Sequence, residues 1–437
     1  MRHMRLAQLL VAPVKYNPVE HKIIVYNDLD FEIILTGADM AATRVRQDTA
    51  WSPAFDWMEK MVLAPEALRF AKRNVAPGYL IVTDPLFQAE IAPFAAWKAK
   101  QGLRVSVVST DQFGSGATLT EGLKAYLHNL YNQATSENPA PSFVLFVGDH
   151  EQIPAFNGQA GVHVTDLYYA TVTPGDFLPE YMMGRFSAQN VEQLRPQIEK
   201  TMEYENGQFS DPKFLQEAVL VAGWDFNWTH SHGWPHIIYA RENYCNSGHG
   251  FSKVSFFPTP APQMNAANII ANIARGARFI NYTAHGSPTS WLDPAFSITN
   301  IEKLGNKGKY PFVIGNCCLT NKFEVDTCFG EAWLRARDAG AIGYVGGSNS
   351  TFWDEDLWWG IGLHAIVMPN DEGMPPDKDQ TGPGALDSLF EGNNVPNAGV
   401  MLAGNLAVES STSARKQYYW EIYHLMGDPA LKTRRPR

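Results

Sequence analysis

Two adjacent cysteines, Cys317 and Cys318, follow the stretch PFVIGN at residues 311–316 and make up half of the four cysteines in the chain. A cysteine at the end of an apolar stretch can be a small core residue, a metal ligand, or a nucleophile that attacks as the thiolate. Adjacent cysteines are poorly placed to form a disulfide with each other or to share a tetrahedral zinc ion. The pair therefore raises the question of which sulfur reacts.

Two further side chains with catalytic chemistry also follow apolar stretches. His285 and Gly286 come after residues 277–284, and Asp225 comes shortly after residues 217–223. Ligand sites of open α/β sheets lie beyond the carboxyl ends of the strands, so neighbouring strands would bring imidazole, thiol and carboxylate together. A histidine can exchange the thiol proton while a carboxylate orients its ring, and backbone amides beside Gly286 can hold an oxyanion.

The elements that position these residues are predicted from apolar strands alternating with amphipathic helices after residue 78. Continuous apolar strands separated by helices are typical of a parallel sheet covered on both faces. The alternation runs twice, with a break near residue 210. We therefore predict an α/β protein with two adjacent α/β subdomains, residues 75–210 and 211–437, whose mainly parallel sheets are covered by helices. The expected strands are 79–84, 104–110, 142–149, 217–223, 254–258, 277–284, 311–316 and 341–347.

The N-terminal residues 1–74 differ from the rest. HKIIVYNDLDFEIILTG clusters β-forming residues around an Asn-Asp turn signal, which predicts a small β-rich segment. RFAKRNVAPG follows as a basic linker. The opening MRHMRLAQLLVAPV has basic residues before a short apolar run that breaks at Pro13, so a degenerate secretion signal is an alternative interpretation.

Composition excludes several classes of protein. Apolar residues make up 45% and charged residues 18% of the 437 residues, which indicates a folded chain with more than one domain or subdomain. A net charge of −10 argues against nucleic-acid binding. No stretch reaches the roughly 18 continuous apolar residues of a membrane span.

Three longer motifs carry a resemblance to a known family. FINYTAHGSPTSW, KYPFVIGNCCLTNKF and CFGEAWLRARDAGAIGYVGGSNSTFWDED resemble the gingipains, cysteine endopeptidases of the caspase-like clan, and are most similar to the lysine-specific gingipain. The resemblance covers roughly residues 75–430 and implies a caspase-like fold whose second subdomain carries a Cys-His dyad. It implies that Cys318 is the nucleophile, that His285 is the catalytic histidine, and that Asp225 orients its ring.

The resemblance also assigns the remaining parts of the site. Gly286 and Cys318 would supply the oxyanion amides, Cys317 would be a buried neighbour, and His285 would protonate the leaving amine. Asp356 in FWDED would bind a lysine or arginine side chain, with Thr283, Asn316 and Trp353 lining the pocket. Lysine is favoured because the arginine-specific relatives lack an acid there.

Two departures from the family pattern bear on that pocket. Phe352 stands where a tyrosine is expected, and Asp354 replaces a glycine, so an extra carboxylate could hold either cation. The alternative for the acids at 354–356 is a solvated turn, although the flanking tryptophans are equally compatible with a pocket wall.

Calcium, export and self-processing are further implications of the resemblance. Asp176, the carbonyl of Leu178, and Glu180 match one Ca²⁺ loop, and Glu331 with the carbonyl of Phe323 resembles a second. A helix-start glutamate is the alternative for Glu331. The expected substrates are proteins and peptides, and the expected localisation is secreted or at the cell surface. The N-terminal segment resembles the end of a pro-segment that the enzyme would cut from itself near Arg69, Lys72 and Arg73.

Rival readings belong to other functional classes. His230, His232 and His236 form H-x-H-x₃-H, which a metal-dependent hydrolase would use, although no cysteine accompanies the motif. GYVGGSNS is rich in glycine but has neither the spacing nor the lysine of a phosphate loop. A caspase-like fold kept as a catalytically silent binding module is the third alternative, and the complete Cys, His and Asp set argues against it.

Overall fold

The structure is a computed structural model of the 437-residue chain. It describes residues 1–9, 11–30, 32, 34, 36–37, 39–62, 75–258, 266–362, 373–391 and 395–435. The predicted processing positions Arg69, Lys72 and Arg73 lie outside the described residues. Within the described residues, no helix combines the length and the apolar character that a membrane span requires.

Ten strands form one mixed sheet in the order β10-β9-β11-β15-β16-β17-β8-β5-β3-β4. Their pairings are parallel except that of β16 with β17, which is antiparallel. The strands are β3 (Gly78–Thr83), β4 (Arg104–Ser109), β5 (Phe143–Val147), β8 (Met182–Phe186), β9 (Glu217–Ala222), β10 (Lys253–Phe257), β11 (Phe279–Thr283), β15 (Phe312–Asn316), β16 (Gly343–Gly347) and β17 (Tyr423–Gly427).

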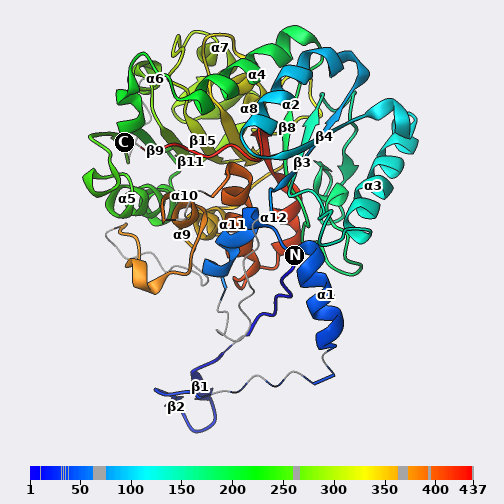
Figure 1. Ribbon diagram of the computed structural model, residues 1–437. Helices are drawn as coiled ribbons and strands as arrows, with labels where there is room; N and C mark the ends of the chain where they lie inside the picture. Colours follow the sequence, from blue (N-terminus) through cyan, green and yellow to red (C-terminus); the bar gives the residue numbers. More distant parts are fainter. Residues whose placement is uncertain are drawn as a thin grey trace.

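Helices cover both faces of this sheet (Figure 1). The helices α2 (Gln88–Lys100), α4 (Val191–Asn206), α6 (Ala266–Arg275), α7 (Ile298–Ile301) and α8 (Phe329–Arg335) lie on one side. The opposite side carries α5 (Trp234–Asn243), α9 (Trp353–Ile361), α10 (Ala385–Glu391) and α11 (Asn397–Glu409), while α3 (Gly116–Asn132) packs on β3 and β5. The last helix, α12 (Lys416–Ile422), leads directly into β17.

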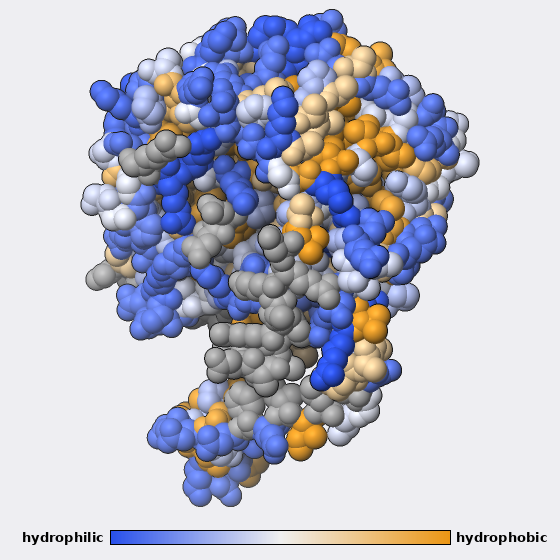
Figure 2. All heavy atoms as spheres, viewed as in Figure 1, coloured by the Kyte–Doolittle hydropathy of each residue, from blue (hydrophilic) through white to orange (hydrophobic). Residues whose placement is uncertain are grey.

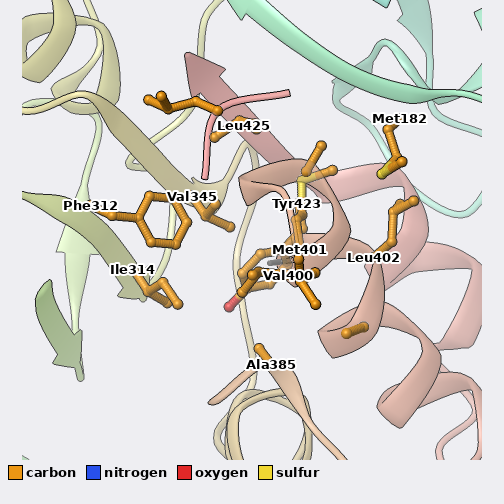
Figure 3. Packing of buried hydrophobic residues seen from close by; sticks show 14 of the residues in the cluster. Met182, Phe312, Ile314, Val345, Ala385, Val400, Met401, Leu402, Tyr423 and Leu425 are labelled. Carbon is orange, nitrogen blue, oxygen red and sulfur yellow. The ribbon is translucent and has the colours of Figure 1, made fainter. Parts of the chain in front are cut away.

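Side chains of the strand before the cysteine pair alternate between two cores. Phe312 and Ile314 of β15 pack with Val400 and neighbouring residues of α10 and α11 (Figure 3), whereas Val313 packs in a second cluster with Trp333 of α8. A strand with both faces buried must be apolar throughout, because successive side chains point to opposite faces. The nucleophile candidate is thus held by a strand that is anchored on both sides.

The continuity of the main sheet was not predicted from the sequence. The two predicted α/β runs are both present, and they share one continuous sheet in which they meet at β17. This strand comes from the end of the chain and pairs with β16, and it contacts β8 where Met426 lies opposite Arg185. The predicted boundary near residue 210 falls between α4 and β9.

The N-terminal segment contains a hairpin and a helix. Strands β1 (Val14–Asn17) and β2 (Lys22–Val25) pair in an antiparallel hairpin, and α1 (Met40–Ala50) follows. The hairpin projects from the body and carries exposed apolar side chains, including Ile23, which is 66% exposed (Figure 2). In the part of this segment that the structure describes, the expected strands form the hairpin, and an unpredicted helix follows it.

Residues on either side of this hairpin are anchored in the protein body. Arg2 is buried, donates from Nη2 to the Ala140 carbonyl at 2.9 Å, and accepts on its own carbonyl from the Tyr131 hydroxyl at 2.9 Å. Phe55 and Met58 are fully buried in the main core. Ala140 lies three residues before β5, so Arg2 is held near the edge of the sheet at which this strand begins.

Two small antiparallel sheets lie beside the main sheet. They are β6 (Phe156–Asn157) with β7 (Val164–Thr165), and the three-stranded β12 (Gly286–Ser287), β13 (Ser290–Leu292) and β14 (Ala295–Ser297). The three-stranded sheet begins directly after His285, so its strand pairing holds the backbone that follows this residue.

Candidate active site

The register of three neighbouring strands brings the predicted catalytic residues to one edge. Thr283 at the end of β11 lies opposite Ala222 of β9 on one side and Asn316 of β15 on the other. Asp225, His285 and Cys318 follow these three ends within three residues, so they emerge side by side. The expected meeting of imidazole, thiol and carboxylate is what the geometry shows.

Asp225 and His285 form a hydrogen-bonded pair, with 2.7 Å between Oδ2 and Nε2. Oδ1 of the same carboxylate accepts from the amides of Asn227 at 2.8 Å and Trp228 at 2.9 Å. Burial raises the pKa of Asp225, but the bonds from His285 and the two amides outweigh it and leave the pKa below its usual value. A carboxylate that stays ionised holds the imidazole by Nε2 and leaves Nδ1 as the nitrogen for proton exchange.

Gly286 lets the histidine strand approach the cysteine pair. A Cβ at this position would lie 2.5 Å from the Cys318 carbonyl oxygen and 3.0 Å from the sulfur of Cys317. Neither a backbone atom nor a buried sulfur can move aside cheaply, so only glycine fits. This close contact fixes His285, its neighbour in sequence, beside Cys318.

The Cys318 sulfur is half-buried and faces Thr351. The Thr351 amide donates to Sγ at 3.3 Å, and the carbonyl and hydroxyl oxygens of Thr351 lie 3.7 and 3.9 Å from it. Burial raises the pKa of the Cys318 thiol, an effect that the Thr351 amide opposes. Among the described residues the sulfur has no hydrogen bond with His285, which matches an imidazole placed to serve the leaving group.

The neighbouring Cys317 points the other way and is fully buried. Its sulfur lies 3.7 Å from the Thr320 hydroxyl, in the cluster that contains Tyr344 and Trp291. Burial raises the pKa of this thiol well above its usual value. A buried neutral thiol is a poor nucleophile, so the two adjacent cysteines have different environments.

Asp356, in the first turn of α9, is buried among hydroxyl groups. Its Oδ2 accepts from the Thr351 hydroxyl at 2.6 Å, and its Oδ1 accepts from Tyr423 at 2.7 Å and Tyr419 at 3.0 Å. Burial raises the pKa of Asp356 to about 7, although the three hydroxyls act to lower it. Because Thr351 touches both Cys318 and Asp356, the buried acid lies next to the candidate nucleophile.

The other expected pocket residues surround this acid. Asn316 donates from Nδ2 to the Tyr423 hydroxyl at 3.1 Å, and it accepts from Asn281 at 3.0 Å. Thr283 lies opposite Asn316 in register. Trp353 packs edge-on against His285, with ring centroids 5.8 Å apart. Asn316 thus shares the Tyr423 hydroxyl with Asp356, Thr283 lies beside Asn316, and Trp353 lies in the same first turn of α9 as Asp356.

The two acids that precede Asp356 have cationic or potentially cationic partners within the protein. Asp354 accepts at 2.8 Å from Nε2 of His232, and Glu355 accepts at 3.1 Å from Arg415. Asp354 is thus directed to a histidine, which answers the question that its substitution for glycine raised. The solvated-turn alternative fails for Glu355 and Asp356, since both are buried.

Four polar residues of this neighbourhood were missed from the sequence. They are Asn281, Thr351, Tyr419 and Tyr423. Asn281 stands two residues before Thr283 and so shares its face of the strand, which was a readable signal. Tyr419 and Tyr423 are far along the chain, and only the tertiary fold brings them here.

The predicted calcium ligands are engaged by other groups. Glu180 accepts at 2.9 Å from the Thr173 hydroxyl and also from the Arg2 amide, while Asp176 accepts at 3.0 Å from the Leu178 amide. Glu331 accepts a hydrogen bond from Arg335 at 3.0 Å, and its other oxygen accepts one from the Cys328 amide at 2.7 Å. Phe323, the other predicted ligand of this site, comes earlier in the chain than both of these partners.

These two neighbourhoods do not fit a divalent ion as they stand. A Ca²⁺ ion takes six to eight oxygen ligands, and the described residues contain no group of three or more metal-binding side chains. At Glu331 a guanidinium already supplies the positive charge. The calcium prediction stays a prediction.

The histidine motif does not converge on a metal position either. His232 pairs with Asp354, His230 stacks on Trp234 with 4.5 Å between ring centroids, and His236 is buried beside α9. Burial lowers the pKa of His236 to about 3. The three rings therefore have three separate environments.

Several known proteins are similar in sequence to this chain. Peptidase family C25 matches residues 72–434. Lys-gingipain of Porphyromonas gingivalis is 35% identical over 442 residues, which cover 99% of this chain and 25% of the relative. Gingipain R2 of the same organism is 26% identical over 347 residues, 78% of this chain and 46% of the relative. The chain thus spans about a quarter of the length of the Lys-gingipains it matches.

Solved structures share the fold as well. One described as "Structure of Protease" is 34% identical, with a TM-score of 0.76 over 83% of this chain and 80% of the other. The crystal structure of the Arg-specific proteinase gingipain R has a TM-score of 0.69 over 82% of this chain and 78% of the other, at 23% identity. The caspase-like α/β fold expected from the motifs is thereby confirmed, and the chain belongs to peptidase family C25.

Proposed function

We propose that this protein is a cysteine endopeptidase that cleaves peptide bonds after a basic residue, with lysine preferred over arginine. The membership in a peptidase family and the similarity to Lys-gingipain support the reaction class. The observation that carries the specificity is the buried carboxyl of Asp356 next to Cys318.

Among the described residues, the side chain of Asp356 has hydroxyl partners only. Its two neighbours pair with His232 and Arg415, whereas among the described residues Asp356 forms no ion pair. A buried carboxylate without a cation is costly, and a buried substrate cation is costly without a carboxylate. A basic substrate side chain and Asp356 would offset each other's desolvation.

The arrangement of donors around Asp356 favours an ammonium over a guanidinium. Oδ1 already accepts from two tyrosine hydroxyls, while Oδ2 accepts from Thr351 alone. A guanidinium binds best when both carboxylate oxygens are open to its planar fork. An ammonium is a compact charge that one oxygen and nearby hydroxyls can satisfy, so lysine fits this environment better.

The roles in the reaction follow from the placement of each group. Cys318, as the thiolate, would attack the carbonyl carbon of the basic residue, and the amides of Gly286 and Cys318 would hold the oxyanion. His285, held by Asp225, would give a proton to the leaving amine as the C–N bond breaks. Water would then attack the thioester, giving the carboxylate product and returning the thiol.

Hydrolysis of a peptide set tests this function. Peptides that differ only by lysine, arginine or norleucine before the cleaved bond should be cut in that order of kcat/KM, since norleucine has the shape of lysine without its charge. Cys318→Ala should abolish cleavage, while Cys317→Ser should lower stability mainly. Equal cleavage of the lysine and norleucine peptides would refute the specificity, and retained cleavage by Cys318→Ala would refute the mechanism.

The two rival functions predict different results. A silent binding module would form no covalent adduct at Cys318 with a lysyl affinity label. A metallohydrolase built on the histidine motif would lose activity when His230 is changed to Ala, although this residue only stacks on Trp234. The complete cysteine, histidine and aspartate arrangement favours the peptidase.

Export and self-processing are carried forward as parts of the proposal. Secretion or surface display rests on the resemblance to the gingipains. A related solved structure is titled as a complex of the RgpB pro- and mature domains, which supports an N-terminal segment that is processed. Incubated alone, the chain is expected to be cut near Arg69, Lys72 and Arg73, and a Cys318→Ala variant is not.

A further inference from the structure

Thr351 contacts both the sulfur of Cys318 and the carboxyl of Asp356. It lies in the connection between β16 and α9, two residues before the helix begins. Its amide donates to Cys318 Sγ at 3.3 Å, and its hydroxyl donates to Asp356 Oδ2 at 2.6 Å. One residue thus contacts the candidate nucleophile mainly through its backbone amide, with its hydroxyl at the longer distance of 3.9 Å, and contacts the candidate specificity acid through that hydroxyl.

The hydroxyl has a distinct place among the three that surround Asp356. Tyr419 and Tyr423 both donate to Oδ1, so Thr351 is the one side chain among the described residues that donates to Oδ2. Tyr419 is itself held by the backbone of Phe352, whose amide donates to the Tyr419 hydroxyl oxygen at 2.8 Å. The orientation of the Oδ2 side, where a further cation could approach, therefore depends on Thr351.

We propose that Thr351 is a positioning residue that couples the basic-residue pocket to the nucleophile. Its hydroxyl keeps Asp356 Oδ2 oriented and charged for the substrate's ammonium, while its amide holds the sulfur in place. This inference rests on the proposed function and assigns it a residue that the sequence motifs did not indicate.

The physical reason is the cost of an unsatisfied buried carboxylate. Without the hydroxyl, Oδ2 would be left without a side-chain donor in a fully buried site, at a cost of about 1–3 kcal/mol or more for a charged group. The acid would meet that cost by taking up a proton, and a neutral acid attracts an ammonium weakly. The amide contact with Sγ would persist, because a side-chain substitution leaves the backbone unchanged.

The two contacts can therefore be separated by experiment. Thr351→Val keeps the shape and the amide but removes the hydroxyl, and Thr351→Ser restores the hydroxyl. Ser350→Ala is the matched control, since this neighbouring exposed side chain makes no hydrogen bond among the described residues. Each variant is assayed with the lysine and norleucine peptides and with iodoacetamide, a small neutral reagent that alkylates Cys318 without using the pocket.

The expected result is a loss confined to the lysine peptide. Thr351→Val should lower kcat/KM for this peptide about 10- to 100-fold, in line with about 1–3 kcal/mol. Its kcat/KM for the norleucine peptide and its rate of alkylation should stay within about threefold of the parent protein. Thr351→Ser should recover most of the loss, and Ser350→Ala should behave as the parent.

Three outcomes would overturn the inference. The first is that Thr351→Val leaves kcat/KM for the lysine peptide unchanged. The second is that Thr351→Val lowers kcat/KM for both peptides and the rate of alkylation by the same factor. The third is that Thr351→Ser is as impaired as Thr351→Val. If Thr351→Val unfolds, Thr351→Ala replaces it, and failure of both to fold would show a purely structural role. Failure of the proposed function is recognised separately, because the parent protein would then cut both peptides equally or Cys318→Ala would remain active.

Discussion

Two buried acids, each in the first turn of its helix, have opposite kinds of partner. Glu331 of α8 is bound by Arg335 at 3.0 Å and by the Ser187 hydroxyl at 2.6 Å, and the same guanidinium reaches Asp149. Asp356 of α9 accepts from three hydroxyls instead. Burial raises the pKa of each acid to about 7. The two acids are thus equally buried, but one is neutralised by an arginine of the protein and the other has hydroxyl donors.

The difference indicates which acid is complete without a ligand. Arg335 joins Glu331 to residues that follow β5 and β8, so its charge is used within the protein to tie α8 to the other half of the sheet. Asp356 has donors that orient it but, among the described residues, no ion-pair partner. We infer that the first acid supports the fold, whereas the second is ready for a cation from outside.

The sharpest way to break this comparison is to neutralise Asp356. In Asp356→Asn we expect kcat/KM for the lysine peptide to fall about 100- to 1000-fold, since 2–5 kcal/mol is typical when one partner of a buried charge pair is lost. The norleucine peptide should be cut at nearly the parent rate. Asp354→Asn, which alters the adjacent acid, is the control and should change neither rate by more than about threefold. A small effect in Asp356→Asn would place the specificity elsewhere.

Removing the internal cation should instead affect stability. Arg335→Met leaves Glu331 and Asp149 buried without their guanidinium, so the free energy of unfolding should fall by about 3 kcal/mol in urea titrations. Activity per folded molecule should stay within about threefold. Lys307→Met, which breaks the exposed pair with Asp338, should show no measurable change in stability. Loss of lysine specificity in Arg335→Met would contradict the separation of roles.

The pH dependence of specificity is the next expected effect. Asp356 has a raised pKa of about 7, so it is neutral below that pH and charged above it. The ratio of kcat/KM for the lysine and norleucine peptides should therefore rise by up to about tenfold per pH unit on approaching 7 and then level off. Taking the ratio cancels the effects of pH on the catalytic steps that the two peptides share. A ratio that stays constant from pH 5 to 9 would show that Asp356 does not bind the substrate cation.

The smallest expected effect is that of removing divalent ions. If Arg335 already neutralises the acids near α8, a chelator should shift the melting temperature by less than about 2 °C, the change that about 1 kcal/mol gives in a chain of this size. Differential scanning fluorimetry with EDTA, then with added Ca²⁺, measures it. A larger fall that Ca²⁺ restores would confirm the calcium prediction and assign Arg335 a secondary role.

The positions of the strands could be predicted from the sequence, whereas the pairing of strands that lie far apart in the chain could not. The apolar stretches at 217–223, 277–284 and 311–316 correspond to β9, β11 and β15, because buried parallel strands must be apolar on both faces. Asp225, His285 and Cys318 were predicted as site residues because they follow the ends of these three strands. The continuity of the sheet was not, since it depends on β17 pairing with β16 across about 80 positions of sequence.

The candidate site divides in the same way. His285 and Cys318 belong to contiguous motifs, whereas the hydroxyls of Tyr419 and Tyr423 reach Asp356 only after α12 has packed in place. The partner of Asp354 could not be read from the sequence either, since His232 lies 122 positions away. Local patterns predict which residue types leave the strands, and tertiary packing decides which carboxyl groups are already neutralised.

The anchoring of the N-terminal segment has a consequence for any cut in the chain between residues 62 and 75. Phe55 and Met58 are fully buried in the core, and Arg2 forms hydrogen bonds through both its guanidinium and its backbone carbonyl. These contacts do not depend on the covalent link to β3. A severed chain would thus run as two fragments on a denaturing gel and still elute as one particle from a sizing column, so processing would nick this protein without releasing its first part.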